Sequence, residues 1–452
     1  MLCCAPLEGL WGGSTPFYSP ASGGHCTHKH DEIEDLSQDR IAIGWVARIY
    51  TILNIILLEM RSILIFCLIA GLFLDAGAQV SKTIRIANNN IVRINSIVRF
   101  KLNPAGDKKN IYLVDKDKKK YPVQFLKDGY ACAIMSLSPG EIKLFKTIRE
   151  SGSGSKAEIL LTEAEAKFTV NGKQVIGLQT GKKALPAEIE PVFRRGGYIF
   201  PVLSPSGLSV ADDYPLNHKH HHGIWAAWTK TEFEGRQPDF WNMGDKTGTV
   251  LFEGIKNKEA GVVFASLESE NAYYDLSVSP NRKILNEYWH ITVYNSEGDE
   301  KPYYVFDLEL RQQLSSSSVL KLPQYLYGGI GFRGNGEWNG KDKANFLTSE
   351  GKDRSNGHAT TSKWVHISGN ISGKLSGISI LSHPDNFRSP QPMRIHPTEP
   401  FFCYAPSQAG AFEINPGKAY VARYRFIVSD GKPDINFINT MWNDYANELI
   451  IK

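Results

Sequence analysis

The chain has 452 residues, of which 42% are hydrophobic and 22% charged, and its formal net charge at pH 7 is +4. This length fits two or three domains with a substantial core. The nearly neutral balance, without a basic stripe or recognition motif, gives no reason to expect a nucleic-acid partner. Aromatic residues make up 11% of the chain, with 9 Trp and 19 Tyr, which fits many β-strands and also surfaces that face carbohydrate.

A secretory signal peptide is predicted to begin at Met60 instead of at the first residue. The sequence from there has one arginine, an apolar run over Ile63–Leu74, and small residues over Ala76–Ala78. This layout predicts a signal peptide over 60–78 with cleavage near Ala78. We therefore expect a periplasmic or secreted protein.

Residues 1–59 are then upstream sequence from a start codon assigned too early. A membrane anchor over 41–74 is the alternative, although three charged residues interrupt its apolar run. Past the predicted cleavage site, no stretch is long and apolar enough to span a membrane. Only Cys132 and Cys403 remain there, either as a disulfide or as two buried free thiols.

Short runs of alternating apolar and polar residues over 79–150 predict a small β-sandwich module. The sequence SGSGS at Ser151–Ser155 has linker composition and marks a boundary. Many more strands follow over 156–433, with Gly, Pro and Asn turns and no βαβ rhythm. The predicted fold class is all-β, a large antiparallel β-sandwich, with a mutarotase-like supersandwich as its analogy and a closed barrel or jelly roll as the alternative. A C-terminal helix is predicted over 434–452.

The stretch Asp212–Trp241 concentrates the residue types that carry chemistry. It contains four histidines in the sequence HKHHHG, two adjacent acids and three tryptophans. Histidine titrates nearest neutral pH and is the commonest metal ligand. As an extended strand, the sequence would place His218, His220 and His222 on one face. The cofactor is left open: a divalent metal held by His218 and His220 is one alternative, and acid–base catalysis without metal is the other.

Other polar and aromatic residues are candidates for binding a substrate. We expect one or two of Trp225, Trp228 and Trp241 to stack on sugar C–H surfaces, although aromatic residues on strands more often belong to the core. The proline-rich loop His383–Pro397 and a glycine-rich strand around Arg333 also offer polar groups. Arg194, Arg195 and Tyr198 could present donors to an anionic or polyhydroxyl ligand, but alone they are weak evidence. Asp307, Glu309 and Arg311 would share one strand face, and each is as compatible with a structural ion pair as with a catalytic role.

Several ordered segments resemble the bacterial family named "methane oxygenase PmoA". They include GYIFPVLSPSG, DDYPLNHKHHHGIWAAW, YGGIGFRG, LSHPDNFRSPQPMRI and AFEINPGKAYVARYRFIVSDG, within Ala157–Gly431. Where that family reads H-P-H-H-R-G, this chain keeps His218, His220 and His221, and departs at Lys219 and His222. The resemblance implies an exported β-rich protein found beside sugar oxidoreductases and polysaccharide-degrading systems. Methane oxidation ranks last, because the part after the predicted signal peptide has no membrane span.

We therefore predict an exported protein that modifies a carbohydrate or glycoside, as a hydrolase, lyase or epimerase. The alternative is a non-catalytic carbohydrate-binding or scaffold protein, and the expected partner in both cases is a carbohydrate or glycoside. The predicted catalytic residues are His218, His220, His221 and Asp213. The predicted substrate-binding residues are Asp212, Trp225, Trp228, Arg333, His383, Arg388 and Arg394.

Overall fold

The computed structural model describes residues 48–49, 51–61, 83–104, 106–150, 154, 156–296 and 302–451. It divides into two compact units, Met1–Gln79 and Val80–Lys452. In the first unit, residues 51–61 are helical and exposed. Most of the predicted signal peptide lies outside the described residues, so it stays a prediction. Within the described part of the chain, no helix is both long and apolar enough to cross a membrane.

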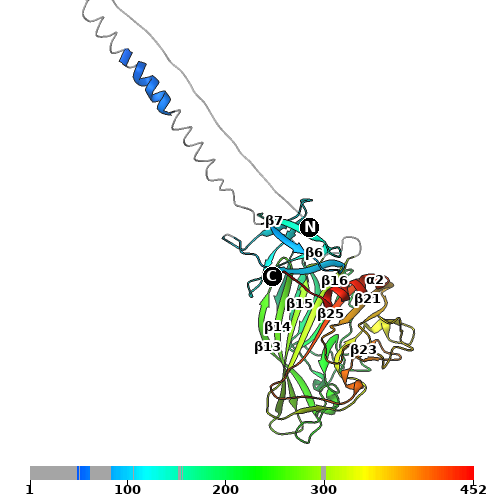
Figure 1. The fold of residues 1–452 in the computed structure, drawn as a ribbon. Coiled ribbons are helices and arrows are strands. Elements are labelled where there is room, and N and C mark those ends of the chain that lie inside the picture. Colours follow the sequence, from blue (N-terminus) through cyan, green and yellow to red (C-terminus); the bar gives the residue numbers. More distant parts are fainter. Residues whose placement is uncertain are drawn as a thin grey trace, which may run out of the picture. The chain divides into compact units, whose positions relative to one another are not determined.

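Two eight-stranded antiparallel sheets form the large domain of the second unit. The first sheet has the order β13-β14-β15-β16-β25-β21-β20-β19, and its long strands run side by side in Figure 1. Its strands are β13 (Gly248–Glu259), β14 (Phe264–Asp275), β15 (Arg282–Tyr294), β16 (Tyr303–Leu314), β19 (Ala344–Thr348), β20 (Trp364–Ile371), β21 (Lys374–Ser382) and β25 (Tyr420–Asp430).

The second sheet has the order β22-β23-β18-β12-β11-β10-β9-β8. Its strands are β8 (Ala157–Leu161), β9 (Glu165–Val170), β10 (Lys173–Gln179), β11 (Tyr198–Val202), β12 (Ile224–Ala227), β18 (Gly329–Arg333), β22 (Met393–Ile395) and β23 (Phe401–Tyr404). One continuous hydrophobic core contains buried residues of both sheets. The prediction of an all-β antiparallel sandwich is confirmed. A short pair, β17 (Leu320–Leu322) and β24 (Phe412–Ile414), lies outside the two sheets.

Strand β16 shows why the apolar–polar alternation places the first sheet against the core. Phe306, Leu308 and Leu310 are buried, whereas Asp307 and Glu309 lie on the opposite face. On that face the two acids form cross-strand ion pairs with Arg425 and Arg423, at 2.8 Å each. These carboxylates, which were candidates for a catalytic role, therefore belong to ion pairs of the sheet.

A smaller β-module precedes the sandwich and has its own hydrophobic core. Its strands form two four-stranded sheets, ordered β1-β7-β3-β4 and β26-β2-β6-β5. They are β1 (Ile84–Ala87), β2 (Arg93–Phe100), β3 (Ile111–Val114), β4 (Lys120–Pro122), β5 (Gln124–Phe125), β6 (Ala131–Leu137), β7 (Ile142–Arg149) and β26 (Leu449–Ile451). The last of these comes from the C-terminal end of the chain.

The C-terminal helix α2 (Ile435–Ala446) is shorter than predicted. Asp434 caps its N-terminus by accepting a hydrogen bond from the Phe437 backbone N–H at 3.0 Å. The prediction of a helix over 434–452 is wrong for the last residues, because Leu449–Ile451 instead pair in parallel with β2. Pairing with β2 satisfies their backbone groups and buries Leu449 in the core of the module.

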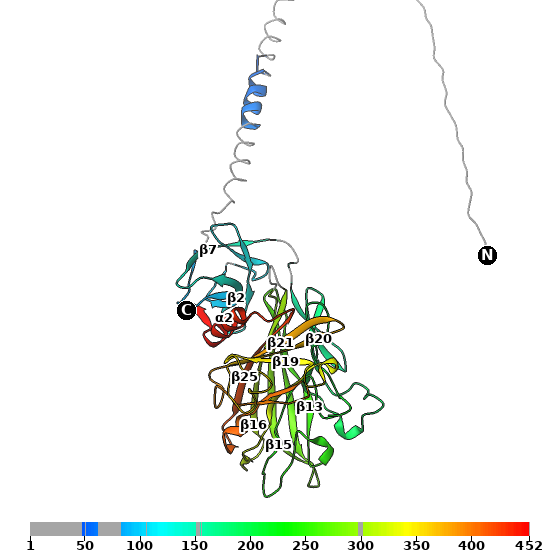
Figure 2. The same cartoon turned by 90° about the vertical axis from the view of Figure 1, so that its right-hand side faces the viewer.

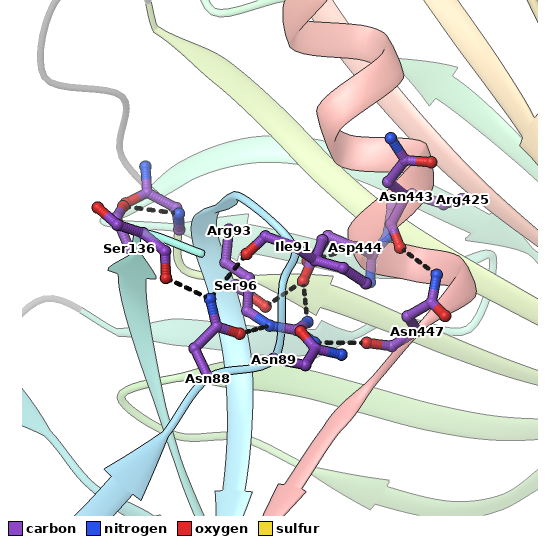
Figure 3. A network of polar contacts seen from close by, with 12 residues as sticks. Asn88, Asn89, Ile91, Arg93, Ser96, Ser136, Arg425, Asn443, Asp444 and Asn447 are labelled. Carbon is purple, nitrogen blue, oxygen red and sulfur yellow. Dashed lines mark hydrogen bonds and ion pairs between the residues drawn. The ribbon is translucent and has the colours of Figure 1, made fainter. Parts of the chain in front are cut away.

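A buried polar network connects the module to α2 (Figure 3). Arg93 of β2 forms an ion pair with Asp444 of α2, and both side chains are almost completely buried. Ser96 donates a hydrogen bond to the same carboxylate at 2.6 Å, while Arg93 also donates to Asn88 Oδ1 and to the Asn447 carbonyl. The module and α2 lie next to each other in Figure 2, so this network is part of their interface.

The two cysteines of the second unit, Cys132 and Cys403, are buried and free. Burial raises the pKa of each thiol to about 12. The free-thiol alternative therefore describes the structure.

Candidate functional site

The histidine-rich segment lies at one end of the second sheet. It leads into β12, which begins at Ile224, and the neighbouring antiparallel strand β18 ends there at Arg333. β23 begins at the same end with Phe401, and the loop 396–400 joins it to β22. Loops far apart in the sequence therefore meet here, as is common for functional sites on a rigid scaffold.

The histidines occupy turns, so the predicted extended arrangement is wrong. The His218 backbone N–H bonds to the Pro215 carbonyl, and the His221 N–H bonds to the His218 carbonyl, both at 2.8 Å. These turns stack the His218 ring on the His221 ring, with centroids 4.7 Å apart and planes at 11°. His221 also stacks on Phe401, and His220 packs edge-on against His221. The rings of His218, His220 and His221 therefore form one cluster, the histidine triplet, and His222 is not part of it.

A carboxylate that the sequence analysis missed, Glu399, lies beside this cluster. Arg333, fully buried, donates to Glu399 Oε2 at 2.7 Å, and Asn217 Nδ2 donates to both carboxylate oxygens at 2.8 and 2.9 Å. Glu399 Oε2 is 3.9 Å from His218 Nδ1. Burial alone would raise the pKa of Glu399, but the hydrogen bonds from Asn217 and the charge of Arg333 outweigh it and lower that pKa. Glu399 is therefore ionised at neutral pH.

The histidines of the cluster are neutral at pH 7. Burial lowers the pKa of His218 below 6.5, although Glu399 opposes the shift, and lowers that of His220 to about 4. A further histidine, His396, has its pKa lowered to about 4 by burial and then by Arg394. Its Nδ1 accepts the backbone N–H groups of Thr398 and Glu399 at 3.3 and 2.9 Å, which leaves Nε2 as the donor.

We expect the fold to lose stability as the pH falls from 6.5 towards 4. The folded state keeps His220 and His366 neutral, with pKa values of about 4, whereas the unfolded chain binds protons from about 6.5 downwards. The free energy of unfolding is therefore at its full value above pH 6.5. Each of the two histidines lowers it by up to on the order of 3 kcal/mol as the pH falls to 4. Urea unfolding between pH 7.5 and 4 measures this. His366→Gln should flatten the profile, and an unchanged midpoint throughout contradicts the prediction.

Asp213, predicted to assist the catalytic histidines, is paired with His222 instead. Its Oδ1 lies 2.8 Å from His222 Nδ1, and its Oδ2 accepts the Tyr198 hydroxyl at 2.9 Å. His222 is fully buried, and its ring packs against those of Tyr198 and Tyr214. The neighbouring Asp212 has its pKa raised by burial, and it accepts only the Asp213 backbone N–H among the described residues. Asp213 therefore belongs to the side of the segment that faces away from the triplet.

The predicted sugar-stacking role of the tryptophans does not fit their positions. Trp225, Trp228 and Trp241 are at most 2% exposed and belong to the core of the sandwich. The Trp225 ring packs against the His221 ring, with centroids 5.2 Å apart. Trp228 donates a hydrogen bond from its indole N–H to Gln312 at 2.7 Å. The reason is their place in the fold: they lie on β12 and the loop after it, where aromatic side chains fill the space between the sheets.

The other predicted binding residues are spread over the domain. Arg388 donates hydrogen bonds to the carbonyls of Pro406 and Gly410 at 2.7 and 2.6 Å. It therefore has a structural role, because it joins its own loop to the segment 406–410. His383 packs edge-on against Tyr445 of α2, not against the triplet. Arg394 lies near the cluster, because its charge helps to lower the pKa of His396, whose ring centroid is 6.1 Å from that of His218. Its Nη1 is also 3.3 Å from His358 Nε2. Of the predicted arginines, Arg333 and Arg394 are therefore the ones at the histidine end of the sheet.

Arg354, on the loop between β19 and β20, is a second residue that sequence reasoning missed. Its three guanidinium nitrogens are shielded from solvent and have no hydrogen-bond partner in the described structure. The group lies over the ring of Phe346, 4.7 Å from its centroid, and burial lowers its pKa although Asp342 and Glu399 oppose this. With Arg333, which forms an ion pair with Glu399, it makes the surroundings of that carboxylate cationic. Across the ranges that the structure describes, no group of three or more His, Cys, Asp or Glu is placed to hold a metal ion.

The fold and the site define a two-sheet antiparallel β-domain with a loop-built, histidine-rich polar centre at one end of a sheet. A family model described as a family of unknown function, DUF6807, matches residues 165–443, and the chain belongs to this family. The expected membership of the methane oxygenase PmoA family is wrong, because no model of that family matches. The segments that carried this resemblance fall inside the matched region. No curated protein matches the sequence.

Proposed function

We propose that this protein is an exported enzyme that modifies a carbohydrate or glycoside by proton transfer at the histidine cluster. The observation that carries the proposal is the pairing of His218 with Glu399. His218 is 32% exposed and neutral, and it lies beside an ionised carboxylate that buried Arg333 holds in place. A neutral imidazole can accept a proton in general base catalysis, and a fixed carboxylate beside it stabilises the imidazolium that results.

In this proposal His218 removes a proton from a substrate O–H or C–H group. The imidazolium that forms is stabilised by Glu399, 3.9 Å away, and the proton is then returned to the product. His396, whose Nδ1 already accepts backbone N–H groups, presents Nε2–H as a donor to a substrate oxygen. Hydrolysis, elimination and epimerisation of a sugar each need such a proton transfer, so the proposal names the step that they share.

The burial of the tryptophans favours an enzyme over a binding module. A non-catalytic carbohydrate-binding surface typically presents aromatic faces to the sugar. Trp225, Trp228 and Trp241 have essentially no exposed surface, while titratable groups are concentrated at the same end of the sheet. Support for export comes from the predicted signal peptide over 60–78.

Incubation with a panel of plain and 3-keto glycosides, with the products identified by mass spectrometry, tests the proposal. We expect conversion of at least one member by the wild-type protein and none by His218→Ala. Tight binding of a glycoside without conversion of any panel member would reject the enzyme and favour the binding protein.

A further inference from the structure

A cavity of about 150 Å³ lies on the side of Tyr198 and Asp213, between strands β10–β11 and the loop 181–190. Its polar lining includes Arg195, Tyr198, Asp213 and Tyr214, and its apolar lining includes Leu185 and Phe200. None of the three clustered histidines, nor Glu399, is among its lining residues. The cavity is therefore a separate site on the same segment of chain.

The size of the cavity fits one six-membered ring. An engineered protein cavity of about 150 Å³ binds a single benzene molecule. A ring with a few small substituents fills the same volume when the cavity opens to solvent, so that the substituents or a second unit can extend outwards. Larger planar cofactors and peptides exceed it.

The polar groups of the cavity match hydroxyl groups better than ions. The two oxygens of Asp213 each hold one hydrogen bond, from His222 and Tyr198, and each keeps a lone pair for a further donor. Arg195 is 2% exposed, and among the described residues its Nε–H is a buried donor without an acceptor. Asp213 repels an anion that approaches its oxygens, and Arg195 repels a cation. Lys183 also lines the cavity, but its side chain is exposed and solvent screens its charge. A hydroxyl group both donates and accepts, so adjacent hydroxyls on a ring satisfy both side chains.

The remaining lining supplies the apolar contact that a sugar ring needs. Leu185 and Phe200 are partly buried beside the polar groups, and the Tyr198 and Tyr214 rings lie edge to face, with centroids 6.4 Å apart. A pyranose has C–H groups on its faces and hydroxyls on its rim, and this combination of surfaces complements both. Burial also raises the pKa of both tyrosines, so their hydroxyls stay protonated.

We propose that this cavity is a subsite for a single neutral pyranose unit, held by Asp213, Arg195 and Tyr214. This inference takes its substrate class from the proposed function, but it concerns binding and not turnover. The subsite gives Asp213 a role as a ligand for sugar hydroxyls, apart from the chemistry at His218.

Isothermal titration calorimetry with glucose, galactose, xylose and glucuronate tests the subsite on the full chain. We expect one neutral sugar to bind, glucuronate to bind at least tenfold more weakly, and two variants to lose at least tenfold in affinity. Ala184→Trp fills the cavity from its exposed loop, and Tyr214→Phe removes a hydroxyl. Lys120→Ala, which breaks an exposed ion pair of the β-module, is the control, with wild-type binding expected.

The outcomes separate this proposal from the proposed function. Sugar binding that survives both Ala184→Trp and Tyr214→Phe overturns the subsite, and so does binding of benzyl alcohol with no binding of any sugar. Sugar binding that both variants weaken, in a protein that converts no glycoside, supports the subsite while the enzyme proposal fails. Circular dichroism of each variant shows whether it is folded, and Leu185→Trp replaces Ala184→Trp if that variant is not.

Discussion

Asp444→Ala should lower the free energy of unfolding by about 3–5 kcal/mol, because it leaves a buried arginine without its counter-ion. Arg93 has no exposed side-chain surface, and Asp444 is only 4% exposed. The substitution also removes the acceptor for Ser96, while the hydrogen bonds of Arg93 to Asn88 and Asn447 cannot neutralise its charge. Urea unfolding at pH 7, followed by tryptophan fluorescence, measures the change.

Two controls separate the buried charge from a general effect of substitution. Lys120→Ala breaks the exposed ion pair with Glu150 and should cost less than about 1 kcal/mol. The double variant Arg93→Met/Asp444→Leu removes both charges and should be more stable than Asp444→Ala alone. Equal losses in Asp444→Ala and Lys120→Ala would show that the buried pair contributes no more than a surface pair.

The strand content of the fold could be predicted from the sequence, because the signal is local. In β16 the alternation of Phe306, Leu308 and Leu310 with polar residues indicates a strand with one buried face. β26 could not be predicted in this way. Three residues that follow a helix carry no periodicity, and only their pairing with β2, about 350 residues earlier, makes them a strand.

The site was predictable where its residues are close in sequence, and not where loops converge. The histidine density predicted a functional site in this segment, and the structure brings the rings of His218, His220 and His221 into contact. Glu399 and Asn217 had no local signal, since they are 182 positions apart and meet only because β12, β18 and β23 are neighbours. The assignment of Asp213 failed because proximity in sequence does not fix which way a side chain points in a turn.

His218→Ala should reduce kcat/KM for a converted glycoside by about 10²–10⁴-fold, the usual contribution of a general acid–base group. The imidazole is partly exposed, and no described residue hydrogen-bonds to its Nδ1, so the fold should tolerate the change. Because burial lowers the pKa of His218, the wild-type activity should rise with pH to a plateau reached below neutral pH. The variant should lose this acidic limb along with the activity.

Neighbouring substitutions show whether the loss is chemical. Lys219→Ala removes an exposed contact with Glu190, at 2.8 Å, and should leave kcat/KM within twofold of wild type. Glu399→Gln keeps the shape of the side chain but removes the charge that stabilises protonated His218, so the acidic limb should move to lower pH as kcat falls. Wild-type kcat/KM in His218→Ala would remove this pair from the mechanism. An unmoved pH profile in Glu399→Gln would do the same, because the charge of a stabilising carboxylate must raise the pKa of the general base beside it.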